Sequence, residues 1–153
     1  AWANAYWWDE ENNRGYAWIV NFSTKNITTN HLSMQLSVSN NAGNQVSKPR
    51  FWKAEWSLTG DMDNEADWHY ITSYTVPDMV VWANTLLSQC PGYKAIDVEL
   101  PLTLLGKENV YIRLMPENNK ASNGASLVDK GATISVKGDA TSAMNYFAIR
   151  YNK

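Results

Sequence analysis

The sequence has only one cysteine, Cys90, among its 153 residues. A single cysteine cannot form a disulfide within the chain or build a cysteine-based metal site. Because it stands beside Pro91 and Gly92, we interpret Cys90 as a small buried hydrophobic residue rather than as a nucleophile. A hydrophobic core must therefore hold the fold together, and a chain of this length is long enough to build one.

Clustered positive charge is also missing. The 13 lysine and arginine residues are scattered, with no two adjacent, and the formal net charge is −2. Nucleic-acid binding needs basic groups gathered against phosphates, so we expect no nucleic-acid partner. No apolar run approaches the ~20 residues that a membrane-spanning helix requires, and no stretch combines an apolar stripe with a basic face. We therefore expect neither a membrane span nor a membrane-surface helix.

Catalytic signatures are absent from the sequence as well. The only histidines, His31 and His69, both lie in strand-like segments. The chain contains no Gly-x-Ser-x-Gly motif, no His-Glu-x-x-His motif and no glycine-rich phosphate loop. Asp97 and Glu99 share a strand face, but a solvated polar face explains them without a glycosidase carboxylate pair. We expect a protein that is not an enzyme.

What the sequence does contain is a period-two alternation of apolar and polar residues. Turn-forming residues fall between the alternating segments. One face of most segments is apolar and the other polar and solvated, which is typical of the antiparallel sheets of a sandwich. We therefore predict an all-β fold, a single antiparallel β-sandwich domain of about eight strands over residues 1–153. The predicted strands are 16–23, 31–39, 51–58, 68–76, 94–100, 110–115, 133–137 and 146–151.

Other parts of the chain do not follow this pattern. Residues 1–15 form a leading segment that we expect to pair on a sheet edge or to cap one end of the sandwich. Residues 77–93 form a long connection, and loops of this length tend to be functional or mobile. One helical turn is predicted near Leu102 to Leu105. Because the chain begins with Ala1, we expect a processed product or an excised piece of a longer protein.

Tryptophan is over-represented, with eight residues. A sugar stacks its apolar C–H face on an exposed indole ring, while Asn, Asp, Arg or Gln side chains bind its hydroxyl groups. The alternative is that the tryptophans fill the core. Trp18, Trp52 and Trp56 lie among apolar strand positions, so we assign them to the core.

Four tryptophans stay as candidates for a ligand-binding surface. Trp7 and Trp8 are adjacent, so in an extended segment one of them faces away from the core. Trp82 lies in the long connection and is a candidate platform, although packing of that loop explains it equally well. Trp68 is explained by a core position too. We take these four, together with Arg113, as candidate ligand-binding residues.

An acidic turn follows the third predicted strand. Asp61, Asp63 and Glu65 place carboxylates at alternate positions, as in the first half of a calcium-binding loop. Ala66 stands where an EF-hand requires glycine, and Thr72 stands where it requires glutamate, so an EF-hand is excluded. A simpler structural calcium site on these three carboxylates stays open beside the alternative of a solvated hairpin turn. We expect no other cofactor.

The order of several strand motifs carries a resemblance to a known family. The chain resembles the galactose-binding-like jelly-roll domains of secreted and surface proteins of gut Bacteroidetes. The resemblance implies a jelly-roll sandwich, often carbohydrate-binding and usually not catalytic, in a bacterial protein that is secreted or at the cell surface. It transfers no fixed set of ligand residues. The motifs are Ala-Trp-Ile-Val-Asn-Phe-Ser-Thr at 17–24, Phe-Trp-Lys-Ala-Glu-Trp-Ser at 51–57 ahead of a Gly-Asp turn and Trp68, Tyr-Thr-Val-Pro at 74–77, Leu-Pro-Leu at 100–102, Asn-Val-Tyr-Ile-Arg-Leu at 109–114, and Asn-Tyr-Phe-Ala-Ile-Arg-Tyr at 145–151.

Two functions follow from these observations. The first is a non-catalytic carbohydrate-binding module whose ligand is an oligo- or polysaccharide. The second is a structural or protein-interaction domain, such as an adhesin or spacer, whose aromatic residues are all in the core. The exposure of Trp7, Trp8, Trp68 and Trp82 separates the two hypotheses, since a glycan needs at least one exposed ring.

Overall fold

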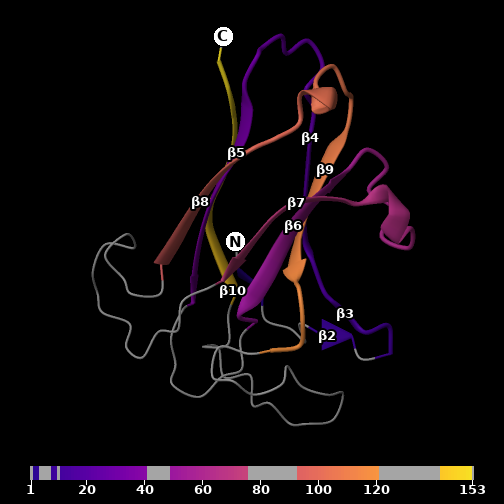
Figure 1. The fold of residues 1–153 in the computed structure, drawn as a ribbon, viewed down its shortest axis with the longest axis vertical. Coiled ribbons are helices and arrows are strands. Elements are labelled where there is room, and N and C mark those ends of the chain that lie inside the picture. The colour runs from indigo at the N-terminus through magenta and orange to yellow at the C-terminus, as the bar shows by residue number, and fades with distance from the viewer. Residues whose placement is uncertain are drawn as a thin grey trace.

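The computed structural model describes residues 2–3, 8–9, 11–40, 49–75, 93–120 and 142–152. Within these residues the protein is all-β, with two single turns of 3₁₀ helix, and no helix is long or apolar enough to cross a membrane. The strands, shown in Figure 1, are β1 (Trp2–Ala3), β2 (Trp8–Asp9), β3 (Arg14–Gly15), β4 (Trp18–Phe22), β5 (Leu32–Asn40), β6 (Phe51–Ser57), β7 (His69–Thr75), β8 (Tyr93–Glu99), β9 (Val110–Pro116) and β10 (Ser142–Tyr151), and the turns are η1 (Glu65–Asp67) and η3 (Leu102–Leu104).

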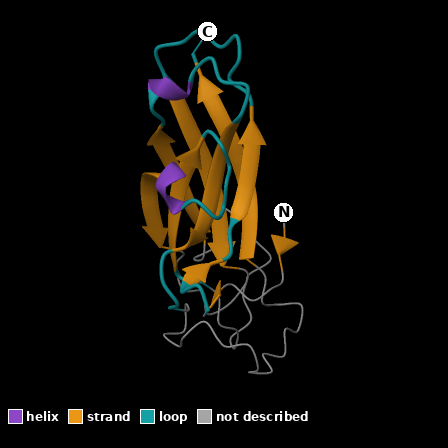
Figure 2. Cartoon of the chain, turned by 90° about the vertical axis from the view of Figure 1, so that its right-hand side faces the viewer, coloured by secondary structure: helices purple, strands orange, loops and turns teal. Residues whose placement is uncertain are grey.

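The longer strands form two four-stranded antiparallel sheets, which pack face to face (Figure 2). The β5 sheet has the order β1-β10-β5-β8, and the β9 sheet has the order β4-β9-β6-β7. Strands β2 and β3 make a separate short ribbon beside the end of β9, where Gly15 lies against Pro116. The predicted all-β sandwich is therefore confirmed over the described residues.

The strand pairs are nested along the chain. Strand β6 pairs with β7, β5 with β8, β4 with β9 and β1 with β10, each pair enclosing the one before it. Two further pairings, β5 with β10 and β6 with β9, join these pairs into the two sheets. As a result, strands from the two ends of the chain lie side by side in the β5 sheet.

The core lies between the sheets and uses the apolar side of each alternating strand. On both central strands, β5 and β9, alternate residues point inward and are buried. Full burial of one such aliphatic side chain stabilises the fold by about 1.5–3 kcal/mol relative to an exposed one. The buried cluster is Leu32, Met34, Leu36, Trp52, Ala54, Tyr74, Leu100, Leu104, Val110, Ile112 and Leu114.

Most of the predicted elements are present. The strands predicted at 16–23, 31–39, 51–58, 68–76, 94–100, 110–115 and 146–151 correspond to β4 through β10. The turn expected near Leu102 is η3, and the leading segment contributes β1 at an edge of the β5 sheet. The strand predicted at 133–137, Cys90 and the connection 77–92 lie outside the described residues.

The outer face of β9 differs from the sequence prediction. Its alternation predicted a solvated face, yet Arg113 is 0% and Met115 3% exposed. The reason is that the segment between β6 and β7 folds back over this central strand. Gly60 in that segment lies against the Tyr111 ring, and Glu65 reaches Arg113. Alternation identifies the two faces of a strand, but it does not show that a loop covers one of them.

Gly60 gives a test of how closely this segment packs on β9. Gly60 and Gly106 both have a φ of +71°, which strains any residue with a Cβ. A Cβ at Gly60 would lie 2.7 Å from Tyr111 Cδ1, whereas a Cβ at Gly106 would meet nothing within 4 Å. We expect Gly106→Ala to cost about 1 kcal/mol of unfolding free energy and Gly60→Ala about 1–3 kcal/mol more, because the added methyl overpacks the contact.

Urea unfolding of both variants measures this difference. Gly106→Ala is the control, because subtracting its loss of unfolding free energy removes the cost of the positive φ that both sites share. Equal losses in the two variants would mean that the segment does not pack closely on the Tyr111 ring.

Candidate functional site

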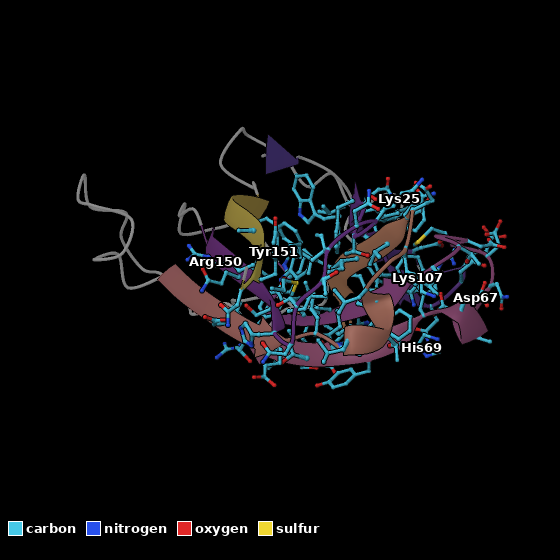
Figure 3. The ribbon with its side chains drawn as sticks, turned by 90° about the horizontal axis from the view of Figure 1, so that it is seen from above. Lys25, Asp67, His69, Lys107, Arg150 and Tyr151 are labelled. Carbon is cyan, nitrogen blue, oxygen red and sulfur yellow. The ribbon has the colours of Figure 1, made fainter. Side chains whose placement is uncertain are left out.

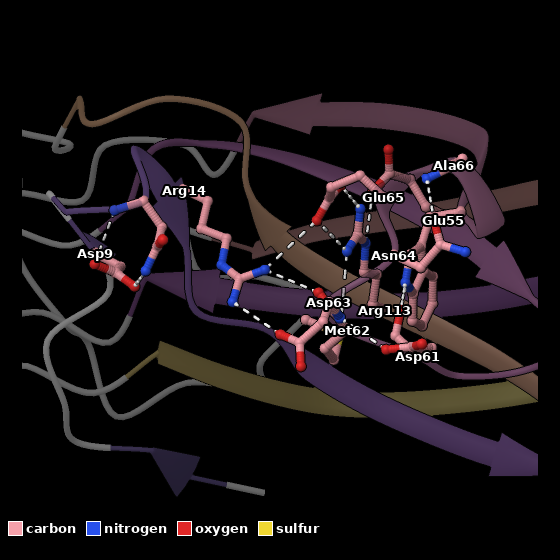
Figure 4. Close-up of polar contacts among 12 residues, drawn as sticks. Asp9, Arg14, Glu55, Asp61, Met62, Asp63, Asn64, Glu65, Ala66 and Arg113 are labelled. Atoms are coloured by element: carbon pink, nitrogen blue, oxygen red, sulfur yellow. Dashed lines mark hydrogen bonds and ion pairs between the residues drawn. The ribbon is translucent and has the colours of Figure 1, made fainter.

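Five residues predicted for ligand or metal binding lie together on the outer face of the β9 sheet. Arg113 projects from β9, and Asp61, Asp63 and Glu65 come from the segment between β6 and β7 (Figure 4). Trp68 ends the same segment. The structure thus brings together residues that are far apart in the sequence. With Glu55 and Arg14 they form what we call the Arg113 cluster.

The buried guanidinium of Arg113 organises the cluster. Its Nε donates to Glu55 Oε2 at 2.7 Å, and its Nη1 and Nη2 donate to the two carboxylate oxygens of Glu65 at 3.0 and 2.5 Å. The indole ring of Trp68 covers one face of the guanidinium, with its centroid 4.4 Å from Cζ. A buried charge is tolerated only when it is paired and hydrogen-bonded, and this arrangement meets both conditions.

Arg14 closes the cluster from the side of β3. Its Nη1 donates to the Met62 carbonyl at 2.8 Å and lies 3.7 Å from Glu65 Oε1, and its Nη2 lies 3.9 Å from Asp63 Oδ1. The Trp68 Nε1–H donates to the Asp61 carbonyl at 2.7 Å. These contacts hold the whole turn against the sheet, so the turn is a structural part of the β9 sheet.

The pKa values of the cluster follow from these contacts. The hydrogen bonds from Arg113 lower the pKa of Glu65 below its ordinary value, and the nearby charges of Arg113, Lys53 and Arg14 act in the same direction. Burial alone would lower the pKa of Arg113, but the carboxylates of Glu65 and Glu55 outweigh it and raise that pKa. Both shifts favour the charged forms of Glu65 and Arg113, which therefore stay ionised at neutral pH.

In this geometry the three carboxylates predicted to bind calcium interact with protein groups instead. Both oxygens of Glu65 bind Arg113, Asp63 lies beside Arg14, and Asp61 Oδ1 accepts a hydrogen bond from the Asp63 backbone N–H at 2.9 Å. A cation on these carboxylates would have to compete with two guanidinium groups. Across the residues that the structure describes, no group of three or more His, Cys, Asp or Glu side chains is arranged to hold a metal ion.

Trp68 and Arg113 are likewise internal, with Trp68 only 7% exposed. Arg113 is occupied by Trp68 and the two glutamates, and Trp68 by Arg113 and the Asp61 carbonyl, so neither presents a surface to a ligand. Trp8 is partly buried and packs against the core, and Trp7 and Trp82 lie outside the described residues. The core assignment made for Trp18, Trp52 and Trp56 is confirmed, because Trp52 is buried and Trp18 and Trp56 pack against the core.

The Arg113 cluster predicts a specific pH dependence of stability. The pKa of Glu65 is lower in the folded protein than its ordinary value of 4.5. Its ionised form therefore contributes fully to the free energy of unfolding above pH 4.5, and this contribution is lost as the pH falls through the lowered folded pKa. We expect Glu65→Gln to lower the unfolding free energy at pH 7 and to reduce its decline in acid. Denaturant unfolding across the acid range measures both effects.

The matched control is Glu108→Gln, which removes a carboxylate from an exposed ion pair with Lys25. Exposed pairs contribute little, so this variant should differ from the wild type by less than about 1 kcal/mol. Parallel pH profiles for wild type and Glu65→Gln would contradict the role assigned to Glu65.

A second feature lies on the opposite side of the sandwich, on the outer face of the β5 sheet. It is a depression of about 530 Å³ whose lining includes His31, Ser33, Gln35, Asp97, Arg150 and Tyr151. Its volume falls in the range of about 300–1,000 Å³ that is typical of small-molecule sites. The three adjacent strands β8, β5 and β10 supply nearly all of this lining.

The strand register explains why this face is hollow. Ser33 on β5 pairs with Arg150, and Ala148 on β10 pairs with Gln35, so the two short side chains are diagonal neighbours with longer side chains beside them. Ser33 is only 4% exposed and forms part of the floor. The two rows that cross the sheet here are Asp97–Gln35–Ala148 and Glu99–Ser33–Arg150.

The lining of the depression is chiefly polar and offers both donors and acceptors. Gln35 Nε2 donates to Asp97 Oδ2 at 2.7 Å, which fixes the carboxylate on one side. Arg150 lies on the other side, on the outer face of β10 (Figure 3). Tyr151 follows it at the end of that strand and is 43% exposed. The site thus combines a carboxylate, an amide, a guanidinium and a phenol ring.

The sequence did not reveal this depression, because its polar residues look like the ordinary solvated faces of three separate strands. Two short side chains, Ser33 and Ala148, could have indicated the depression. Their significance depends on the strand order β10-β5-β8, which the sequence alone does not give. Comparisons of the chain with protein-family models, with curated proteins and with solved structures found no match. The site has to be interpreted from its own chemistry.

Proposed function

We propose that this protein binds glycan without catalysis, through the depression on the outer face of the β5 sheet. The observation that carries the proposal is the hollow formed over Ser33, with charged and amide side chains on both sides of it. This function agrees with the family resemblance. The proposed location, secreted or at the surface of a bacterial cell, rests on that resemblance alone. The ligand would be an oligo- or polysaccharide.

The chemistry of the lining suits sugar hydroxyl groups. A hydroxyl both donates and accepts, so it pairs with an acceptor such as Asp97 and with a donor such as Arg150. Hydrogen bonds to charged groups contribute about 1.5–3 kcal/mol each, about twice the neutral value. Tyr151, which is 43% exposed, lies at the margin of the depression at the end of β10, where its ring would offer an apolar face for the C–H side of a sugar. No tryptophan lines the depression as described, so this proposal differs from the tryptophan platform inferred from the sequence.

We also propose that the sandwich is a jelly roll. A jelly roll consists of two interlocked Greek keys shared between two sheets. The nested pairs β6–β7, β5–β8, β4–β9 and β1–β10, divided between the two sheets, support this topology. The topology matters for function, because it places β10 between β1 and β5 and so brings Arg150 beside Ser33.

Glycan binding at this site makes a direct prediction. We expect the wild type to be retarded in native gels containing at least one polysaccharide from a panel of plant and host glycans. Arg150→Ala and Tyr151→Ala should each weaken that retardation by about tenfold, the equivalent of ~1.4 kcal/mol, because each removes one contact to the sugar.

Two matched controls test whether the effect is local. Tyr70→Ala removes a more exposed tyrosine on β7, and Lys120→Ala removes an exposed cation outside the depression. Neither should change retardation. Loss of binding in the controls as well, or no retardation of the folded wild type by any glycan, would contradict the proposal.

A second function, a structural or protein-interaction domain, is favoured by the packing of the tryptophans. The five indole side chains within the described part of the chain, those of Trp8, Trp18, Trp52, Trp56 and Trp68, are buried or pack against the core or Arg113. This is the arrangement that a domain without a glycan ligand requires of its aromatic residues. The described tryptophans therefore do not support stacking on a sugar.

Tryptophan fluorescence separates the two functions further. If all eight tryptophans are internal, the emission of the native protein is blue-shifted and resists quenching by acrylamide. A quenchable, red-shifted fraction that disappears in the double variant Trp7→Phe, Trp82→Phe would instead identify exposed rings and count against the purely structural function. Trp52→Phe serves as the control, since Trp52 is buried and its loss should leave the quenchable fraction unchanged.

A further inference from the structure

We infer that the depression on the β5 sheet selects neutral sugars and discriminates against sugars that carry a carboxylate. The inference rests on the proposed glycan-binding function and assigns its ligand class. It is drawn from the charges around the depression, from the fixed position of one carboxylate, and from the spacing between the charged groups on the two flanking strands.

The charges around the depression do not favour an anion. On the outer faces of β8, β5 and β10, the described charged side chains are Asp97, Glu99 and Arg150. His31 lies at the margin, with its Nδ1 3.8 Å from Glu99 Oε1. Asp97 and Arg150 line the depression on opposite sides, and Glu99, which pairs with Ser33, adds a second carboxylate on the same face outside the lining. A site for an acidic sugar needs the opposite balance, since like charges brought together raise the free energy of the complex.

Asp97 is held in a position that suits hydroxyl groups. Its Oδ2 accepts the hydrogen bond from Gln35 Nε2, and both side chains line the depression. This bond leaves Asp97 Oδ1 and the amide oxygen of Gln35 as two neighbouring acceptors. Two adjacent hydroxyl groups of a sugar ring can donate to such a pair, whereas a carboxylate has no proton to donate at neutral pH.

The sheet geometry places the donor opposite these acceptors. Asp97 lies on β8 and Arg150 on β10, with β5 between them, so two strand spacings, roughly 10 Å, separate their backbones. Between them on β5, the short side chain of Ser33 forms part of the floor of the depression. A single sugar ring lying over Ser33 therefore reaches the Asp97–Gln35 pair with one edge and Arg150 with the other. A carboxylate on the sugar could form an ion pair only with Arg150, whereas the carboxylates of Asp97 and Glu99 would repel it.

The test uses one polymer in two charge states. Polygalacturonate and its carboxyl-reduced form share a backbone but differ in charge, and neutral galactomannan and xyloglucan complete the panel. In native gels at physiological ionic strength we expect the neutral polymers, as a group, to retard the wild type at least about tenfold more strongly than polygalacturonate.

The variant that probes the mechanism is Asp97→Asn. Its amide oxygen can still accept from Gln35, but the negative charge is gone, so the tenfold preference should fall to about threefold or less. The control is Asp67→Asn, because Asp67 also accepts a side-chain hydrogen bond, from Thr59, but lies on the β9 sheet side, away from Arg150 (Figure 3). This control should keep the wild-type preference.

The outcomes distinguish the inference from the proposed function. Retardation by polygalacturonate equal to or greater than that by the neutral polymers would overturn the inference and leave glycan binding intact. An unchanged preference in Asp97→Asn would also overturn it. If no polymer retards the folded wild type, the proposed function fails and the inference fails with it.

Discussion

The structure of the β9 sheet depends on one buried positive charge. Arg113 projects from the middle of a central strand into a space that water does not reach. Neighbouring side chains must therefore stabilise its charge. Glu55 from β6 and Glu65 from the turn between β6 and β7 provide the compensating negative charges, and the ring of Trp68 covers one face of the guanidinium. Glu55 is itself buried and pairs with both Arg113 and Lys53, so only the loss of Glu55 and Glu65 together would leave Arg113 without a carboxylate partner. The acidic turn is therefore fixed in place by the strand that it covers.

This constraint separates the two outer faces of the sandwich. On the β9 sheet the outer face is covered by the turn, and its charges are satisfied internally. On the β5 sheet no described segment covers the region around Ser33, and its polar groups line a depression open to a ligand. Side chains of the same types, carboxylates and arginines, thus have different roles on the two sides. The covered network stabilises the fold, whereas the uncovered one lines the depression for which we propose glycan binding.

The alternation of the sequence was sufficient to predict the strands and the sandwich, because a strand with one apolar face must bury that face. It could not predict the sites, since each depends on neighbours that the strand order brings together. Glu65 and Arg113 are separated by two strands in the sequence and meet only because the turn folds over β9. For the same reason Asp61, Asp63 and Glu65 suggested a calcium site, although arginines occupy their surroundings. The short side chains of Ser33 and Ala148 had no significance until the pairing of β5 with β10 placed them diagonally across the two strands.

The nested strand pairs have a consequence for how the chain folds. The innermost pair, β6 with β7, joins segments close in sequence, whereas the outermost pair, β1 with β10, joins segments from near the two ends. Pairings between distant segments cost more loop-closure entropy and form more slowly. The hairpin of β6 and β7 can therefore form while the chain is still being synthesised, and it already includes the turn that will cover Arg113. The β5 sheet can be completed only when β10 has emerged, so a ribosome-bound chain would hold a partly assembled β9 sheet before the depression over Ser33 exists.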